Sequence, residues 1–204
     1  MKRQVIVIHG GDVYDSYEAY ISSLKKTELD FERLKNKKSW KTSLAQKLGD
    51  GFEVVLPEMP NDMNAKYLEW KIWFDKVVPF IEDGAVLVGH SLGGIFLAKY
   101  LSENRVPREI RATFLIAAPF DDEDTPEASD ESLGDFALPP SLDGFARQGG
   151  DIYIYQSEDD PVVSSADMAK YARALPEAKQ RVFKGRGHFI DPELPELVAD
   201  IRVL

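Results

Sequence analysis

Residues 85–94 read AVLVGHSLGG, an apolar run that leads into a Gly-x-Ser-x-Gly pentapeptide and one further glycine. The apolar run predicts a strand, and GIFLAKYL (94–101) predicts a helix directly after it. Glycines at positions 89 and 93 would leave room for a tight, strained turn at Ser91. Such a turn raises the hydroxyl above the sheet, beside the N-terminus of the next helix. Ser91 is therefore a candidate nucleophile, and the alternative is a serine in a structural glycine-rich loop.

Short apolar runs of strand character recur along the chain between longer helical patterns. The other runs are QVIVI (4–8), FEVVL (52–56), ATFLIA (112–117), DIYIY (151–155) and QRVF (180–183). Helical spacing covers residues 40–48, 67–81, 94–103, 165–174 and 193–202. Continuous apolar runs indicate strands that are buried on both faces. This alternation predicts an α/β fold with a mainly parallel sheet, and ligands are expected at the carboxyl ends of its strands.

Composition and length limit the classes of function. The chain has 204 residues, of which 44% are hydrophobic and 29% charged, as expected for one globular domain, residues 1–204. Its net charge of −10 argues against nucleic-acid and anionic-membrane partners, because these require clustered basic residues. The absence of cysteine excludes disulfides, thiolate zinc sites and a cysteine nucleophile.

No targeting segment is recognised in the sequence. The apolar run at the N-terminus, residues 5–8, is much shorter than the core of a signal peptide. No apolar stretch approaches the roughly 18 residues of a membrane-spanning helix. A cytoplasmic location is therefore the simplest expectation.

Two long connections interrupt the regular alternation of strands and helices. Residues 12–39 follow the first strand and contain a helical pattern through Tyr17, Tyr20 and Leu24. Residues 121–150 begin with the acidic sequence DDEDTPEASDESLGD. Connections of this length are usually functional or disordered, so both are predicted as lid elements of the single domain.

A serine nucleophile requires a base, and the chain offers three histidines. His188 lies in KGRGHFID, a glycine-containing loop just after the last predicted strand, where the imidazole would reach the carboxyl edge of the sheet. His90 adjoins Ser91, but neighbouring side chains diverge at such a turn, so local packing or a local hydrogen bond is expected for it. His9 ends the first strand, and we expect it to support the following loop. His188 is the predicted base.

An acid is needed to orient the imidazole and to stabilise its protonated form. The sequence QSEDDPVV (156–163) follows the fifth predicted strand and offers Glu158, Asp159 and Asp160. Asp160 is preferred because Pro161 restricts it to an extended conformation, and Asp159 is the alternative. The resulting order along the chain, serine, then aspartate, then histidine, is that of the α/β-hydrolases.

Acyl transfer also requires donors for the oxyanion of the tetrahedral intermediate. The backbone N–H of Leu92, directly after the nucleophile, is the first candidate. The second is expected in HGGD (9–12), at Gly11 with Asp12 as the alternative, unless this stretch is only a turn. The sequence contains no recognisable metal, Walker A or dinucleotide motif, so no metal and no cofactor are expected.

HGG after the first strand, GHSLGG, DDPVV and GHF together resemble the α/β-hydrolase superfamily. More narrowly, the chain is similar to small YdeN-like serine hydrolases related to retinoblastoma-binding protein nine. LPEMP after the second strand and a tryptophan opening a helix also fit this group. The 12–39 insertion departs from its compact members, and inherited substrate specificity cannot be inferred across it.

The resemblance implies a three-layer α/β/α sandwich around a six-stranded, mainly parallel sheet in the order 2-1-3-4-5-6. It also implies Ser91, Asp160 and His188 as a catalytic triad for hydrolysis of esters or thioesters of small to medium acyl groups. A protein partner is not indicated. The alternative is a binding or regulatory protein whose chemistry is vestigial. Four residues are expected to line the substrate pocket: Tyr14, Tyr17, Phe120 and Val162.

Overall fold

The computed structural model describes residues 2–29, 31, 35, 38–123 and 132–204. It contains a six-stranded sheet in the order β2-β1-β3-β4-β5-β6, in which every neighbouring pair is parallel. The strands are β1 (Arg3–Ile8), β2 (Phe52–Val55), β3 (Ala85–His90), β4 (Ile110–Ile116), β5 (Asp151–Ser157) and β6 (Lys179–Phe183). The helices of the described residues are α1 (Tyr17–Lys26), α3 (Trp40–Leu48), α4 (Tyr67–Val77), α5 (Leu92–Glu103), α6 (Asp143–Gln148), α7 (Ser165–Ala174) and α8 (Pro195–Arg202), with short 3₁₀ turns at Asp62–Asn64, Val78–Phe80 and Gly134–Phe136.

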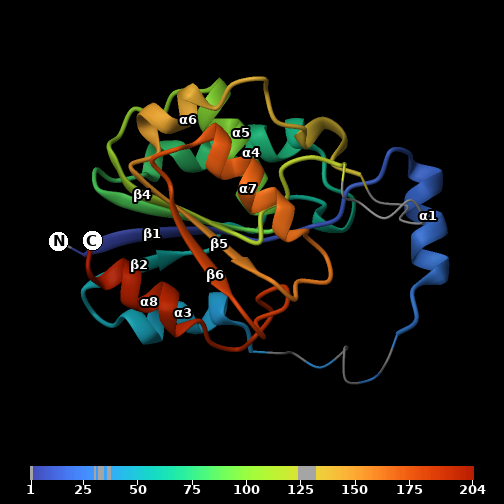
Figure 1. The fold of residues 1–204 in the computed structure, drawn as a ribbon, viewed down its shortest axis with the longest axis horizontal. Helices are drawn as coiled ribbons and strands as arrows, with labels where there is room; N and C mark the ends of the chain where they lie inside the picture. The colour runs from blue at the N-terminus through green and yellow to red at the C-terminus, as the bar shows by residue number, and fades with distance from the viewer. Residues whose placement is uncertain (1, 30, 32–34, 36–37, 124–131) are drawn as a thin grey trace.

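Helices cover both faces of the sheet, as Figure 1 shows. The helices α4, α5, α6 and α7 lie over one face, where Trp70, Phe96 and Tyr171 are buried in the larger hydrophobic core. The helices α3 and α8 lie over the other face, where Trp40 and Ile201 belong to the second core. The predicted three-layer sandwich and the predicted strand order are confirmed.

The side chains of the central strands alternate between these two cores. In β1, Ile6 belongs to the larger core and Val7 to the second one. In β3, Leu87 and Val88 divide in the same way. The central positions of these inner strands need apolar side chains to fill both cores, which explains their continuous apolar runs in the sequence.

The expectation that all the strands are buried on both faces is wrong at the two edges of the sheet. β6 is exposed along most of its length, and β2 has only half-buried and exposed positions. An edge strand has one neighbour instead of two, and fewer helices pack over it. The sequences FEVVL and QRVF therefore predicted two strands correctly, but they did not predict how far these strands are buried.

The predicted lid in residues 121–150 is not a lid over its second half. Phe136, Leu142 and Phe145 are buried in the larger core, and α6 packs against α5. These apolar side chains repeat at irregular spacing, so the sequence pattern did not reveal a packed segment. Residues 124–131, which hold most of the acidic stretch, lie outside the described residues.

The insertion at 12–39 contains the helix expected around Tyr17. No residue of α1 is buried, and Figure 1 shows this helix at the edge of the molecule, beyond the carboxyl ends of the strands. Residues 30, 32–34 and 36–37 of the insertion lie outside the described residues. The lid function of this segment therefore stays a prediction. Within the part of the chain that the structure describes, no helix has both the length and the apolar character needed to cross a membrane.

Candidate active site

Ser91 lies at the junction of β3 and α5, at the carboxyl edge of the sheet. Its backbone has φ 55° and ψ −124°, a conformation that residues with a side chain rarely adopt. The two flanking glycines make this turn sterically accessible. A Cβ on Gly89 would lie 2.4 Å from the Gly93 carbonyl oxygen, and one on Gly93 would lie 2.4 Å from that of Ile8. Ser91 is therefore held in a strained turn packed against the end of β1.

This strain predicts an unusual order of stabilities for two variants that both lack the hydroxyl. We expect Ser91→Gly to be more stable than Ser91→Ala by about 1 kcal/mol, because relief of the strain exceeds the entropic cost of glycine. Chemical unfolding of the two proteins measures the difference. A Ser91→Gly protein that is no more stable than Ser91→Ala would show that the turn is not strained.

His188 and Asp160 are in direct contact although they are far apart in the sequence. His188 Nδ1 lies 3.1 Å from Asp160 Oδ1 and 3.0 Å from Oδ2. The Asp160 side chain is fully buried, whereas that of His188 keeps 14% of its surface exposed. The Asp160 carboxylate also accepts hydrogen bonds from the backbone N–H groups of Val162 and Val163, at 2.8 and 3.1 Å. These donors fix the direction of the carboxylate toward the imidazole.

The neighbouring acid, Asp159, has a different environment. Its Oδ1 accepts hydrogen bonds from the Ser157 hydroxyl at 2.5 Å and from the Gly185 N–H at 2.8 Å. These contacts tie the end of β5 to the loop that follows β6. Of the two alternatives that the sequence left open, the structure brings Asp160 against His188.

Two aromatic side chains fix the backbone of the loop that carries His188. His90 Nε2 donates a hydrogen bond to the His188 carbonyl oxygen at 2.8 Å, and Trp40 Nε1 donates one to the Phe189 carbonyl oxygen at the same distance. Burial lowers the pKa of His90 well below its ordinary value, so its ring is neutral. Its buried Nδ1 has no hydrogen-bond partner among the described residues. His90 therefore supports the His188 loop instead of acting as a local packing residue alone.

His9 supports the loop after β1, as expected from the sequence. Its Nε2 accepts a hydrogen bond from the Met59 N–H at 2.8 Å, and its Nδ1 lies 2.6 Å from the Gly10 carbonyl oxygen. An accepting Nε2 requires the proton on Nδ1, which then donates to Gly10. Both ring nitrogens of His9 are thus occupied by backbone groups.

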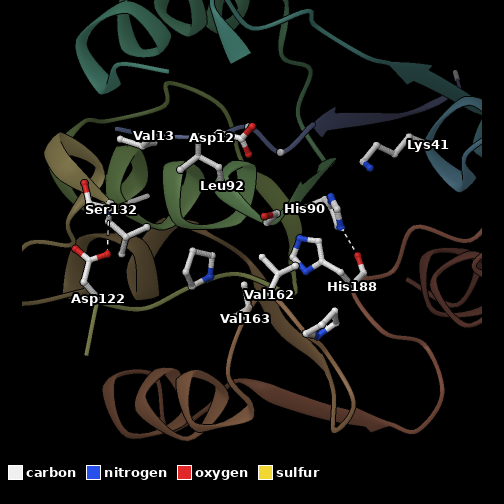
Figure 2. Close-up of a pocket in the computed structure, with 16 residues that line it drawn as sticks. Asp12, Val13, Lys41, His90, Leu92, Asp122, Ser132, Val162, Val163 and His188 are labelled. Carbon is white, nitrogen blue, oxygen red and sulfur yellow. Dashed lines mark hydrogen bonds between the residues drawn. The ribbon is translucent and has the colours of Figure 1, made fainter. Parts of the chain in front are cut away.

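Ser91 and His188 line the same cavity, which has a volume of about 590 Å³. This size is within the usual range for small-molecule sites, about 300–1,000 Å³. No hydrogen bond joins the Ser91 and His188 side chains, which are both in the described part of the chain. Such contacts are often loose until a substrate is bound. Figure 2 shows the His188 ring facing the cavity beside His90 and Val162.

Two backbone amides near Ser91 have no acceptor among the described residues. These are the N–H groups of Leu92, the first residue of α5, and of Gly11 in the loop after β1. Gly11 cannot carry a side chain, because its Cβ would lie 2.6 Å from the Asp62 carbonyl oxygen. Asp12, the alternative donor, is already used: its N–H donates to that same oxygen at 2.8 Å. The geometry leaves Leu92 and Gly11 as the pair of available donors.

The structure places one of the four residues expected in the substrate pocket on the cavity. Val162 lines the cavity, but the side chains of Tyr14, Tyr17 and Phe120 do not. Tyr14 is buried and hydrogen-bonded to Ser23, Tyr17 is 65% exposed on α1, and Phe120 packs on Tyr171. These positions were chosen for their proximity in sequence to strand ends, which does not determine side-chain direction.

Several lining residues were missed by the sequence analysis: Val13, Lys41, Pro119, Asp122, Ser132, Leu133 and Val163. Most come from the connections after β1 and β4, at positions outside the recognised motifs. Lys41 belongs to α3, which covers the face of the sheet opposite α5. In the sequence, only its position next to Trp40 could have indicated that it lies near the cavity. The described residues contain no group of three or more His, Asp or Glu side chains that could hold a metal ion.

The sheet topology and the geometry around Ser91 are those of an α/β-hydrolase. A family model described as "Serine hydrolase" matches residues 33–192, and the chain belongs to this family. The protein is accordingly a serine hydrolase. No curated protein matches the sequence.

Solved structures support the fold. The ydeN gene product from B. subtilis has a TM-score of 0.77 at 18% identity, with 99% of this chain and 98% of that chain covered. The thioesterase domain from the curacin biosynthetic pathway has a TM-score of 0.64 at 15% identity, with coverages of 100% and 92%. A carboxylesterase of Nitrososphaera gargenis has a TM-score of 0.62 at 16% identity, with 99% of this chain and 89% of that chain covered. The resemblance to YdeN-like α/β-hydrolases is confirmed.

Proposed function

We propose that the protein hydrolyses esters or thioesters of small to medium acyl groups through Ser91, His188 and Asp160. The observation that carries this proposal is the joint position of Ser91 and His188 in one cavity, with a fully buried Asp160 bonded to the imidazole. Similar structures include a thioesterase domain and a carboxylesterase. An amide is a less suitable substrate, because an amine is a poorer leaving group.

The reaction proceeds in two acyl transfers. Ser91 Oγ attacks the carbonyl carbon while His188 Nε2 takes the hydroxyl proton, and the Leu92 and Gly11 N–H groups stabilise the oxyanion. The bond to the leaving alcohol or thiol then breaks, and His188 returns the proton to it. Water attacks the acyl-enzyme, His188 takes the proton of this water, and the carboxylic acid leaves as the proton returns to Ser91. Asp160 orients the imidazole and stabilises its protonated form in both halves of the cycle.

A fluorophosphonate tests the proposed nucleophile without knowledge of the substrate. We expect one adduct per chain, detected by intact mass and mapped by peptide analysis to Ser91. Formation of the adduct joins the Ser91 oxygen to phosphorus and releases fluoride, with the serine proton passed to His188.

Ser132 provides a matched control, because this second serine also lines the cavity but is hydrogen-bonded to Asp15. Ser132→Ala should keep the adduct, whereas Ser91→Ala and His188→Ala should lose it. A folded wild-type protein that forms no adduct, or one that is modified at Ser132, would contradict the role of Ser91. The absence of any adduct would favour the alternative, a binding or regulatory protein whose chemistry is vestigial.

A further inference from the structure

Lys41 is the second residue of α3, and its side chain lines the cavity that contains Ser91 and His188. The side chain is half-buried, and Figure 2 shows it reaching toward His90. His90 in turn lies against His188, with ring centroids 5.0 Å apart. The ammonium group therefore lies at the side of the cavity where the base is held.

Among the described residues, no acidic side chain forms an ion pair with this ammonium group. Its nitrogen lies 5.1 Å from the centre of the Trp40 ring, and the nearby His90 is neutral. Burial lowers the pKa of Lys41 to about 8. The first turn of a helix is also unfavourable for a cation, because the macrodipole is positive there.

These features mean that the charged Lys41 side chain lowers the stability of the folded protein. Lys47, in the last turn of the same helix, is exposed to solvent and forms an ion pair with Glu193 at 2.7 Å, so its charge carries no such cost. A lysine that is desolvated in a cavity and has no carboxylate partner is stabilised when a bound anion supplies the opposite charge. The position of Lys41 is thus explained by a ligand that brings a negative group.

Charges on the lining of the cavity indicate which part of the substrate is anionic. Asp12 and Asp122 line the cavity, and Figure 2 shows Asp122 and Val13 at the opposite side from Lys41, with Asp12 between them in this view. An acyl chain fits beside Val13 and Leu92, and the Asp122 carboxylate would repel an anion at that side. The leaving group must instead lie near the imidazole that protonates it, on the side of His90 and Lys41.

We propose that the natural substrates are esters or thioesters whose leaving alcohol or thiol carries a carboxylate or phosphate group, which Lys41 binds. This inference rests on the proposed function, because it assigns a leaving group to the reaction at Ser91. It makes Lys41 a specificity-determining residue. The acyl part of the substrate is neutral.

A matched pair of esters tests this proposal: the butanoyl esters of 4-hydroxybenzoate and 4-hydroxybenzamide. Their leaving groups have nearly the same shape and differ by one negative charge. We expect Lys41→Met to lower the ratio of their kcat/KM values, benzoate over benzamide, by about tenfold. Lys47→Met removes the same charge from the other end of the helix and should leave the ratio as in the wild type.

The pH dependence of this ratio is a second measurement. Lys41 loses its charge as pH rises through about 8, so the wild-type preference for the benzoate ester should decline there. Lys41→Arg remains charged and should keep its preference above that pH. His90 and His188 face the same space, and Asp12 and Asp122 also line the cavity. Any effect that is common to the two esters cancels in the ratio.

Three outcomes would overturn the proposal: a ratio unaffected by Lys41→Met, an equal fall in Lys47→Met, or a Lys41-dependent preference for an ester with the carboxylate on its acyl chain. Failure of the proposed function gives a different result, namely no fluorophosphonate adduct on Ser91 and no turnover of either ester. An adduct together with turnover and an unchanged ratio overturns only the role of Lys41.

Discussion

Replacing Ser91 with alanine is expected to lower kcat/KM for ester hydrolysis by about 10⁴-fold or more. The substitution removes the oxygen that would form the acyl-enzyme and keeps the Cβ that packs near Gly10, so the fold should be retained. The residual rate would come from the Leu92 and Gly11 amides, which still polarise the bound carbonyl. Steady-state kinetics on a 4-nitrophenyl ester measure the loss.

The unfolding transition of the same variant serves as its control. It should resemble that of the wild type, which separates a chemical defect from a structural one. Hydrolysis within tenfold of the wild-type rate would mean that another group attacks the ester, and the proposed mechanism would then be wrong.

The second large effect is expected for Asp160→Asn, which should lower kcat by about 10³- to 10⁴-fold. The asparagine side chain keeps an oxygen for the Val162 and Val163 N–H groups, so the turn is preserved. It carries no negative charge to stabilise the protonated imidazole, and its amide favours the wrong tautomer of His188. A low kcat with a nearly unchanged KM would show that binding is intact.

Asp159→Asn is the matched control, since it removes one charge from the adjacent residue. Asp159 contacts Ser157 and Gly185 instead of His188, and an asparagine oxygen can accept both hydrogen bonds. We expect only a small change in kcat. Comparable losses in the two variants would assign the effect to loop structure, and a larger loss in Asp159→Asn would reverse the choice of acid.

The central sheet was predictable because its strands must fill two cores. The central positions of β1 and β3 face one core or the other, and this produces the unbroken apolar runs at residues 5–8 and 85–88. The same rule failed at β6, where one edge has no neighbouring strand and most of the side chains are exposed. It also missed the packed segment around Phe136 and Phe145, whose apolar residues follow no regular period.

The site residues differ in how they could be inferred. Ser91 is recognisable because its strained turn demands glycines at fixed spacing, and the structure contains that turn. Asp160 and His188 were inferred from their positions after strands, and they meet because parallel strands end at one edge of the sheet. Tyr17 follows a strand as well, yet it belongs to a helix and does not line the cavity.

The sequence by itself determined the α/β order and the glycine spacing of the serine turn, and it pointed to the candidate acid and base that follow later strands. Each of these depends on local backbone geometry or on the requirement for continuous burial, and both leave regular patterns in a chain. Only the tertiary structure decided which side chains line the cavity, that His90 and Trp40 hold the His188 loop, and that Lys41 reaches the site from the other face of the sheet. Those contacts join residues from α3, β3 and the loop before α8, and their approach depends on how the layers pack rather than on any spacing along the chain.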